Sequence, residues 1–169
     1  RRPDRRVSYE SGGSEDRVTQ RNWIVIGLLL VLVAGGVFAY GSGIFDAPGG
    51  IDPGDRDKVA LGARIYAENC ASCHGADLEG QPDWRRRLAS GRLPAPPHDE
   101  TGHTWHHPDA QLFALTKQGP AALVGGGYES DMPAYESVLS DAEIWAVLSY
   151  IKSRWPQEIQ ARHDQISGR

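Results

Sequence analysis

Residues 70–74, Cys70-Ala71-Ser72-Cys73-His74, decide how this chain is interpreted. Two thiols three residues apart on a helical turn lie on the same side, and an imidazole follows directly. The pair uses both cysteines of the 169-residue chain, so no disulfide framework remains to be found. A structural zinc site needs four ligands, and the chain has no second cysteine pair. A thioredoxin-like dithiol would lie in a βαβ pattern, which the surrounding sequence does not show.

The motif matches C-x-x-C-H, the attachment signature of c-type haem. In this interpretation Cys70 and Cys73 form thioethers with the porphyrin, and the imidazole of His74 is the proximal ligand of the iron. We therefore expect one covalently attached haem c as the cofactor of this chain.

Met132 is the only methionine and lies 58 residues beyond His74, after a glycine run at residues 125–127. Pro133 biases its predecessor toward extended backbone, which directs the thioether away from a helix core. A lone methionine more often fills a core, but this context favours Met132 as the second axial ligand. His/Met ligation raises the reduction potential and leaves no open coordination position, which suits electron transfer better than catalysis.

A long apolar segment near the N-terminus predicts a membrane anchor. Residues 23–40 are almost wholly apolar, and no charged residue occurs between Asn22 and Phe45. At about 1.5 Å per residue this length crosses most of a ~30 Å hydrocarbon core. Residues 1–21 carry six arginines against four acids, which predicts a cytoplasmic N-terminus and an outer C-terminal domain. A cleaved signal peptide, with a loose small-x-small match at residues 39–41, is the alternative.

The rest of the chain predicts helices. Helical spacing brings Val59, Gly62, Tyr66 and Cys70 to one face that leads into the motif. A glycine inside a helix costs about 1 kcal/mol relative to alanine, so we expect another backbone to pack closely at Gly62.

A capping box at Ser140 and Glu143 begins a C-terminal helix that could be this packing partner. A third helix is predicted from Pro108, at its first position, to a terminating Gly119. The chain shows no convincing strand pattern, so the expected fold class is all-α. The apolar stripe of the C-terminal helix consists of Ile144, Val147, Leu148, Ile151 and Trp155.

These features together resemble the class I cytochrome c family over about residues 57–155. The matching residues are Gly62-x3-Tyr66-x3-Cys70-x2-Cys73-His74, Asp131-Met132-Pro133-x-Tyr135, and a last helix containing Trp145 and Tyr150.

The resemblance implies that the first and last helices cross at the small residue and that haem lies between helices. It implies a single-electron carrier on the periplasmic side of a bacterial inner membrane, not an enzyme. It also implies that one proline carbonyl, of Pro94, Pro96 or Pro97, accepts a hydrogen bond from His74.

The expected organisation combines these segments. It consists of a cytoplasmic tail (1–21), a transmembrane signal-anchor helix (22–41), a short linker (42–56), the haem domain (57–155) and a C-terminal tail (156–169). The expected partners are a quinol-oxidising complex and a terminal oxidase or reaction centre, with the chain as tethered carrier or fixed subunit. From Asp46 onward twelve Lys and Arg stand against eighteen Asp and Glu, a net charge of −6 that disfavours nucleic acid.

Two other functions stay open at this point. A displaceable Met132 would suit a haem enzyme or a gas sensor. Alternatively, a histidine-rich loop could bind copper or zinc or replace Met132 as axial ligand; it contains His98, His103, His106 and His107. Other candidates near the haem propionates are Trp84, Arg85, Arg86, Arg87 and Trp105.

Overall fold

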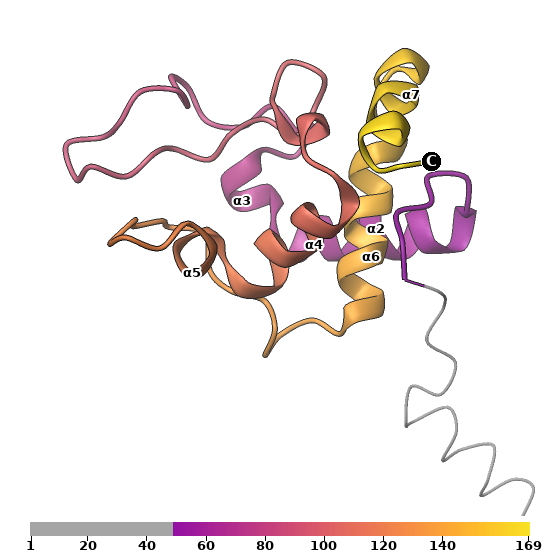
Figure 1. Ribbon diagram of the computed structural model, residues 1–169, viewed down its shortest axis with the longest axis horizontal. Helices are drawn as coiled ribbons and strands as arrows, with labels where there is room; N and C mark the ends of the chain where they lie inside the picture. The colour runs from indigo at the N-terminus through magenta and orange to yellow at the C-terminus, as the bar shows by residue number, and fades with distance from the viewer. Residues whose placement is uncertain (1–48) are drawn as a thin grey trace, which may run out of the picture. The chain divides into compact units, whose positions relative to one another are not determined.

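The computed structural model describes residues 49–169. In this range the chain forms helices and loops without a strand (Figure 1), which confirms the all-α prediction for the described part. The predicted transmembrane helix at residues 22–41 lies outside the described residues, and no helix within 49–169 combines the length and apolar character of a membrane span. The elements are α2 (Arg56–Asn69), α3 (Ala71–His74), η1 (Thr104–His106), α4 (Asp109–Gln118), α5 (Pro120–Val124), α6 (Asp141–Ser153) and α7 (Gln157–Ile166).

Helices α2 and α6 cross at Gly62, as the resemblance implied, and the close backbone packing predicted at this glycine is confirmed. A Cβ atom added to Gly62 would lie 2.0 Å from the backbone oxygen of Ala146. Only a glycine lets the two backbones approach this closely. Both helices begin with side-chain caps: Asp55 accepts from the backbone of α2, and Ser140 forms the predicted capping box with Glu143 at the start of α6.

The apolar core lies between α2, α4 and α6. The predicted stripe of α6 is buried throughout, and Tyr66 and Ile65 of α2 pack against it. Helix α4 contributes Leu112 and begins one residue after Pro108, which is its N-cap and not its first residue. Gly119, with φ +79°, ends α4 as predicted.

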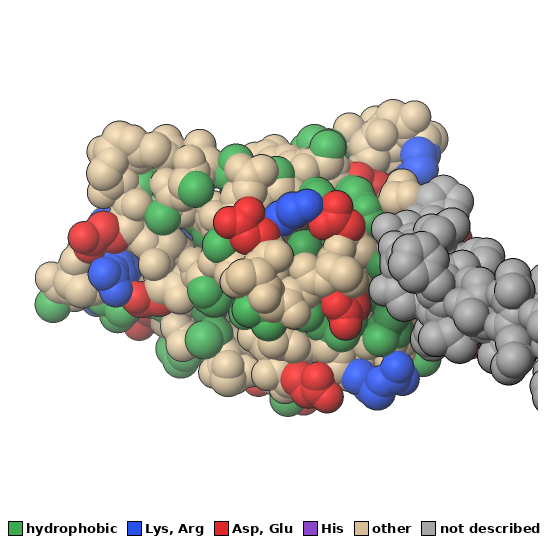
Figure 2. All heavy atoms as spheres, turned by 90° about the horizontal axis from the view of Figure 1, so that it is seen from below, with side chains coloured by type: hydrophobic (Ala, Val, Ile, Leu, Met, Phe, Trp, Pro, Cys, Tyr) green, Lys and Arg blue, Asp and Glu red, His purple; other side chains and the backbone are tan. Residues whose placement is uncertain are grey.

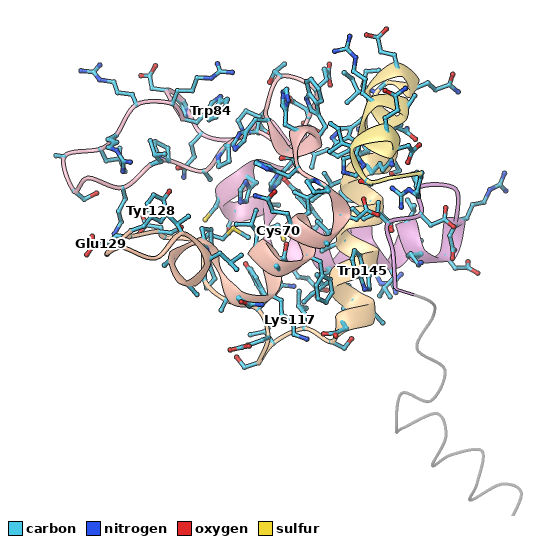
Figure 3. The ribbon with its side chains drawn as sticks, viewed as in Figure 1. Cys70, Trp84, Lys117, Tyr128, Glu129 and Trp145 are labelled. Atoms are coloured by element: carbon cyan, nitrogen blue, oxygen red, sulfur yellow. The ribbon has the colours of Figure 1, made fainter. Side chains whose placement is uncertain are left out.

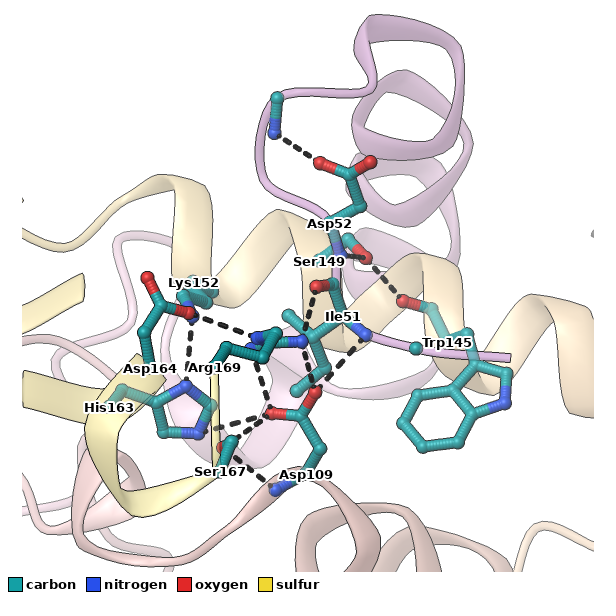
Figure 4. Close-up of polar contacts among 12 residues, drawn as sticks. Ile51, Asp52, Asp109, Trp145, Ser149, Lys152, His163, Asp164, Ser167 and Arg169 are labelled. Carbon is teal, nitrogen blue, oxygen red and sulfur yellow. Dashed lines mark hydrogen bonds and ion pairs between the residues drawn. The ribbon is translucent and has the colours of Figure 1, made fainter. Parts of the chain in front are cut away.

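Residues 156–169, expected as a tail, instead contain helix α7, which packs on the domain through the buried Ile159 and His163. A polar network fixes this helix (Figure 4). The ammonium group of Lys152, fully buried on α6, donates to Asp164 at 2.5 Å and to Nδ1 of His163 at 3.0 Å. Nε2 of His163 donates in turn to the backbone oxygen of His107 at 3.0 Å.

Asp109, at the start of α4, joins both ends of the described domain. Its carboxylate accepts from Arg169 Nη1 at 2.6 Å, from the Ser167 hydroxyl at 2.9 Å and from the Ile51 backbone at 3.4 Å. Arg169 also donates to the Ile51 carbonyl oxygen at 3.1 Å. Ile51, near the start of the described residues, and Arg169, the last of them, are therefore held side by side on this carboxylate (Figure 4).

The surface charge is mixed on the face drawn in Figure 2, where acidic and basic side chains alternate between apolar patches. One ion pair of the domain joins Lys117 of α4 to Asp141 of α6 at 2.6 Å. Such interspersed charges keep a surface soluble without a large field of one sign.

Candidate functional site

The motif residues are held on one tight turn where α2 passes into α3. Cys70 caps the end of α2, and its carbonyl oxygen accepts from the backbone N–H of Cys73 at 3.1 Å and of His74 at 2.9 Å. Gly75, with φ +82°, ends α3 directly after His74. Both cysteines are free thiols, so both sulfurs are available for covalent attachment.

A cavity of about 820 Å³ opens beside this turn. Cys70, Cys73 and His74 line it, and Met132 lines it from the loop between α5 and α6. The volume lies within the usual range of cofactor sites, about 300–1,000 Å³. Apolar side chains from α4, from α6 and from the loop between α3 and η1 also line the cavity, among them Leu93, Leu112, Leu115, Val147, Leu148 and Ile151.

The imidazole of His74 is oriented by a hydrogen bond from its Nδ1 to the backbone oxygen of Pro96, at 2.8 Å. Because a carbonyl oxygen only accepts, Nδ1 carries the proton and Nε2 keeps its lone pair. Burial lowers the pKa of His74, which favours the neutral form that ligates metals. Of the three prolines that the resemblance suggested, Pro96 is therefore the one whose carbonyl oxygen accepts from His74.

Burial, reinforced by the neighbouring Cys73, raises the pKa of the Cys70 thiol to about 11. Cys70 therefore stays a protonated thiol at neutral pH and lacks the low pKa of a catalytic cysteine.

Two tyrosines tie the site to the helices. Tyr66 donates to the carbonyl oxygen of Gly75 at 2.9 Å, just after His74, and Tyr135 donates to that of Asn69 at 2.7 Å, just before Cys70. Burial raises the pKa of both phenols, so both hydroxyls remain donors. Tyr135 lies three residues after Met132 and so fixes one end of the loop that carries it.

The four histidines of residues 98–107 do not gather around one point. His98 is stacked on His74 with ring centres 3.9 Å apart, and its Nδ1 pairs with Thr104 Oγ1 at 2.7 Å. His103 stacks on Trp84, and His106 stacks on a neighbouring tryptophan. Within residues 49–169 no group of three His, Cys, Asp or Glu side chains is placed to hold a metal ion. The structure therefore gives no support to the copper-site alternative.

Only some of the proposed propionate contacts line the cavity. Trp84 and Arg85 do, with the guanidinium of Arg85 4.1 Å from the centre of the indole ring. Arg87 instead donates to the Gly91 carbonyl oxygen at 2.6 Å. Tyr128, which sequence reasoning missed although it directly follows the glycine run, lines the cavity from the loop after α5 (Figure 3).

The donor set and shape of this cavity fit a haem. Two thiols and an imidazole line it from the turn between α2 and α3, a thioether lines it from a separate loop, and apolar side chains form the walls. Thioether and imidazole are the axial ligands of an electron-transfer haem, and the two thiols match covalent attachment. This arrangement can bind and shield a redox cofactor.

Comparisons with known proteins agree with this geometry. The family model described as cytochrome c matches residues 59–155. Subunit CcoP of the cbb3-type cytochrome c oxidase of Azospirillum sp. (strain B510) is 32% identical over 99 residues, covering 57% of this chain and 29% of that protein. The CcoP subunit of Rhodobacter capsulatus is 31% identical over 101 residues, covering 60% and 31%. Subunit FixP of Bradyrhizobium sp. (strain ORS 278) is 30% identical over 95 residues, covering 56% and 27%.

The matched part of the chain spans only about three tenths of the length of these curated relatives. No solved structure matches the chain.

Proposed function

This chain belongs to the cytochrome c family, and we propose that it transfers single electrons through one haem bound in the 820 Å³ cavity. Cys70 and Cys73 attach the haem through thioethers. His74 and Met132 would ligate the haem iron through an imidazole nitrogen and a thioether sulfur. Each of these four roles agrees with the sequence prediction and with the place of the side chain along the cavity wall.

One observation carries this proposal: a single cavity receives both cysteines of the chain, an imidazole already fixed through Nδ1, and the only methionine. Met132 lies 58 positions after His74, so its meeting with the motif residues is a property of the fold. A methionine that only filled the core would not have to share a cavity with a cysteine pair. The combination favours a haem held by these four residues over a zinc site or an enzyme pocket.

A bound haem supplies a one-electron redox centre. The protein holds this centre in one environment in both oxidation states. Pro96 fixes the orientation of the His74 ring, and the apolar side chains of α4 and α6 exclude water. No residue needs to accept a proton or form a covalent intermediate, so electron transfer is the chemistry that the site supports best.

We extend the proposal to the cell membrane on the basis of the sequence. Residues 22–41 would anchor the chain in a bacterial inner membrane, with the N-terminus cytoplasmic and the haem domain in the periplasm. The relatives are named as subunits of cbb3-type oxidases. A terminal oxidase is therefore the partner that we propose first, with this chain as its subunit or as a tethered electron donor.

Optical spectra of the full-length protein, expressed in a host that attaches c-type haem, test the ligand set. We expect the wild type to show the methionine–iron charge-transfer absorption and to bind carbon monoxide slowly. The Met132→Leu variant keeps a side chain of similar volume but should lose this absorption and bind carbon monoxide rapidly. Rapid, complete binding by the wild type would instead support the gas-sensor or haem-enzyme alternative.

Acidified acetone tests the covalent attachment. Pigment should stay with the wild-type protein and with a Ser72→Ala control, which alters the motif without removing a thiol. It should be extracted from a Cys70→Ala/Cys73→Ala variant. Release from the wild type would contradict the proposal.

Co-purification with oxidase subunits after mild detergent extraction tests the partner independently.

A further inference from the structure

The loop that carries Met132 is fastened unequally at its two ends. After Met132, the Tyr135 hydroxyl donates to Asn69, and the Tyr135 backbone N–H donates to the Thr116 carbonyl oxygen at 3.2 Å. Before Met132, the glycines at residues 125–127 all have φ between +59° and +79° and are surrounded by open space. Glycines in such surroundings restrain the backbone little, so the N-terminal side of this loop needs another contact to be held.

A second loop, residues 82–94, projects from the side that carries the cysteine motif. Its neck is closed by hydrogen bonds from the Gln81 backbone N–H to the Ala95 carbonyl oxygen and from the Ala95 N–H to the Gln81 side chain, both 2.9 Å. The next residue along the chain is Pro96, which accepts from His74. Residues 82–94 are thus anchored directly to the proximal side of the cavity.

Arg92 joins these two loops. Its Nη1 contacts Asp131 Oδ1 at 2.5 Å, and its Nε contacts Glu129 Oε2 at 3.4 Å. Asp131 is the residue directly before Met132. In the described part of the chain, these are the ion pairs that connect residues 82–94 with residues 125–132. Both loops extend to the same side of the domain in Figure 1.

The guanidinium group suits this contact because its donors point in fixed directions in one plane, so two carboxylates can be held at once. The three side chains are partly exposed, Arg92 to 39%. Each pair is therefore weak by itself. The ion pairs of Arg92 matter because of where they lie: they hold the N-terminal end of the Met132 loop, which Tyr135 does not contact.

We infer that Arg92 is a positioning residue for Met132. It holds Glu129 and Asp131 against the loop at 82–94 and so keeps the thioether over the cavity. This inference rests on the proposed function, because it gives Met132 the role of axial ligand. Without Arg92 the loop opens more often, and an external ligand competes more effectively for the position of Met132.

Imidazole binding to the full-length oxidised protein measures this opening. We expect Arg92→Gln to raise the apparent affinity for imidazole about threefold to fivefold, in line with partly exposed ion pairs. Arg86→Gln is the matched control. It removes one positive charge from the same loop, and the structure gives the Arg86 side chain no ion pair. Imidazole affinity in this control should stay within about 1.5-fold of wild type.

A double-mutant cycle separates the contact from a general charge effect. Asp131→Asn should weaken the contact much as Arg92→Gln does, and the double variant should bind imidazole no better than the stronger single variant. Arg92→Lys keeps the charge but loses the planar fork, so it should fall between wild type and Arg92→Gln. In high salt the difference between wild type and Arg92→Gln should shrink, because exposed ion pairs are screened.

Two outcomes would overturn the inference. If Arg92→Gln and Arg86→Gln bind imidazole alike while the wild type shows the methionine–iron absorption, Arg92 does not position Met132 and the proposed function stands. If the wild type itself lacks this absorption, the ligand assignment and the role of Arg92 are both wrong.

Discussion

The two sides of the cavity differ in how they are built. On the side of the cysteine motif, which we call the attachment side because we propose haem attachment there, Cys70 and His74 follow a helix that crosses α6 in direct backbone contact. His74 is buried, and Pro96 fixes the orientation of its ring. On the other side, Met132 is half-buried on a loop, and its contacts with the rest of the domain include the Tyr135 hydroxyl and the partly exposed Arg92.

This difference indicates which side of the cavity opens more easily. Opening the attachment side requires separating packed helices, whereas opening the Met132 loop requires breaking a few polar contacts. Local openings of proteins take place where few buried contacts oppose them. We therefore expect ligand exchange at the position of Met132 and not at His74, and the following variants test this contrast.

The largest effect should come from Gly62→Ala. The new methyl group would lie 2.0 Å from the backbone oxygen of Ala146, and backbone atoms cannot rotate out of the way. The helices must move apart, so the free energy of unfolding should fall by about 3 kcal/mol or more. Denaturation followed by circular dichroism measures this fall.

Gly50→Ala provides the control for this substitution, since an added Cβ at Gly50 meets no atom within 4 Å. Its unfolding free energy should stay within about 0.5 kcal/mol of wild type. Equal stability of the two variants would show that the α2–α6 crossing does not depend on close backbone contact.

Two tyrosine variants compare the two sides directly. Tyr66→Phe and Tyr135→Phe each remove one hydrogen bond to a backbone carbonyl oxygen, and each should lower the unfolding free energy by about 1 kcal/mol. Only Tyr135→Phe should also raise the affinity for imidazole, because Tyr135 anchors the Met132 loop. An equal rise in Tyr66→Phe would mean that both sides open together.

A smaller effect is expected for His163 on α7, and it concerns the pH dependence of stability. Burial, followed by the charge of Lys152, lowers the pKa of His163, although Asp109 and the His107 carbonyl oxygen act in the opposite direction. His163 already donates from Nε2 and accepts from Lys152 at Nδ1, so a second proton would remove that acceptor and place two positive charges together. Asp164 and Arg169 are the other charged groups beside it.

An unfolded histidine binds its proton near pH 6.5. As pH falls below this value, the unfolded state takes up a proton that folded His163 resists, so the free energy of unfolding decreases. His163→Gln should be less stable at pH 7.5 but lose less stability between pH 7 and 5 than the wild type. Parallel slopes in the two proteins, measured by denaturation at several pH values, would assign the pH dependence to other groups.

Much of the attachment side was predictable from the sequence. The motif, the close packing at Gly62, the capping box at Ser140 and the stripe of α6 follow from local spacing, which helical geometry translates directly into position. The resemblance narrowed the partner of His74 to three prolines, and the fold selected Pro96.

The remaining features depend on loops that meet only after folding. The contacts of Arg92 join residues 37 and 39 positions apart, and an arginine in a polar stretch carries no periodic signal that would reveal them. Helix α7 was missed because its face toward the domain buries only one apolar side chain, Ile159, beside a histidine that pairs with a buried lysine. Hydrophobic periodicity cannot identify a helix that docks through such a pair.

The junction at Asp109 has a practical consequence for work with this protein. Ile51 and Arg169 share one carboxylate, so the polypeptide that leads to residues 1–48 and anything fused after Arg169 leave the domain from neighbouring points. A bulky purification tag at the C-terminus would crowd that departure point and pull on Arg169. A fusion partner would therefore need a flexible spacer to leave the junction intact.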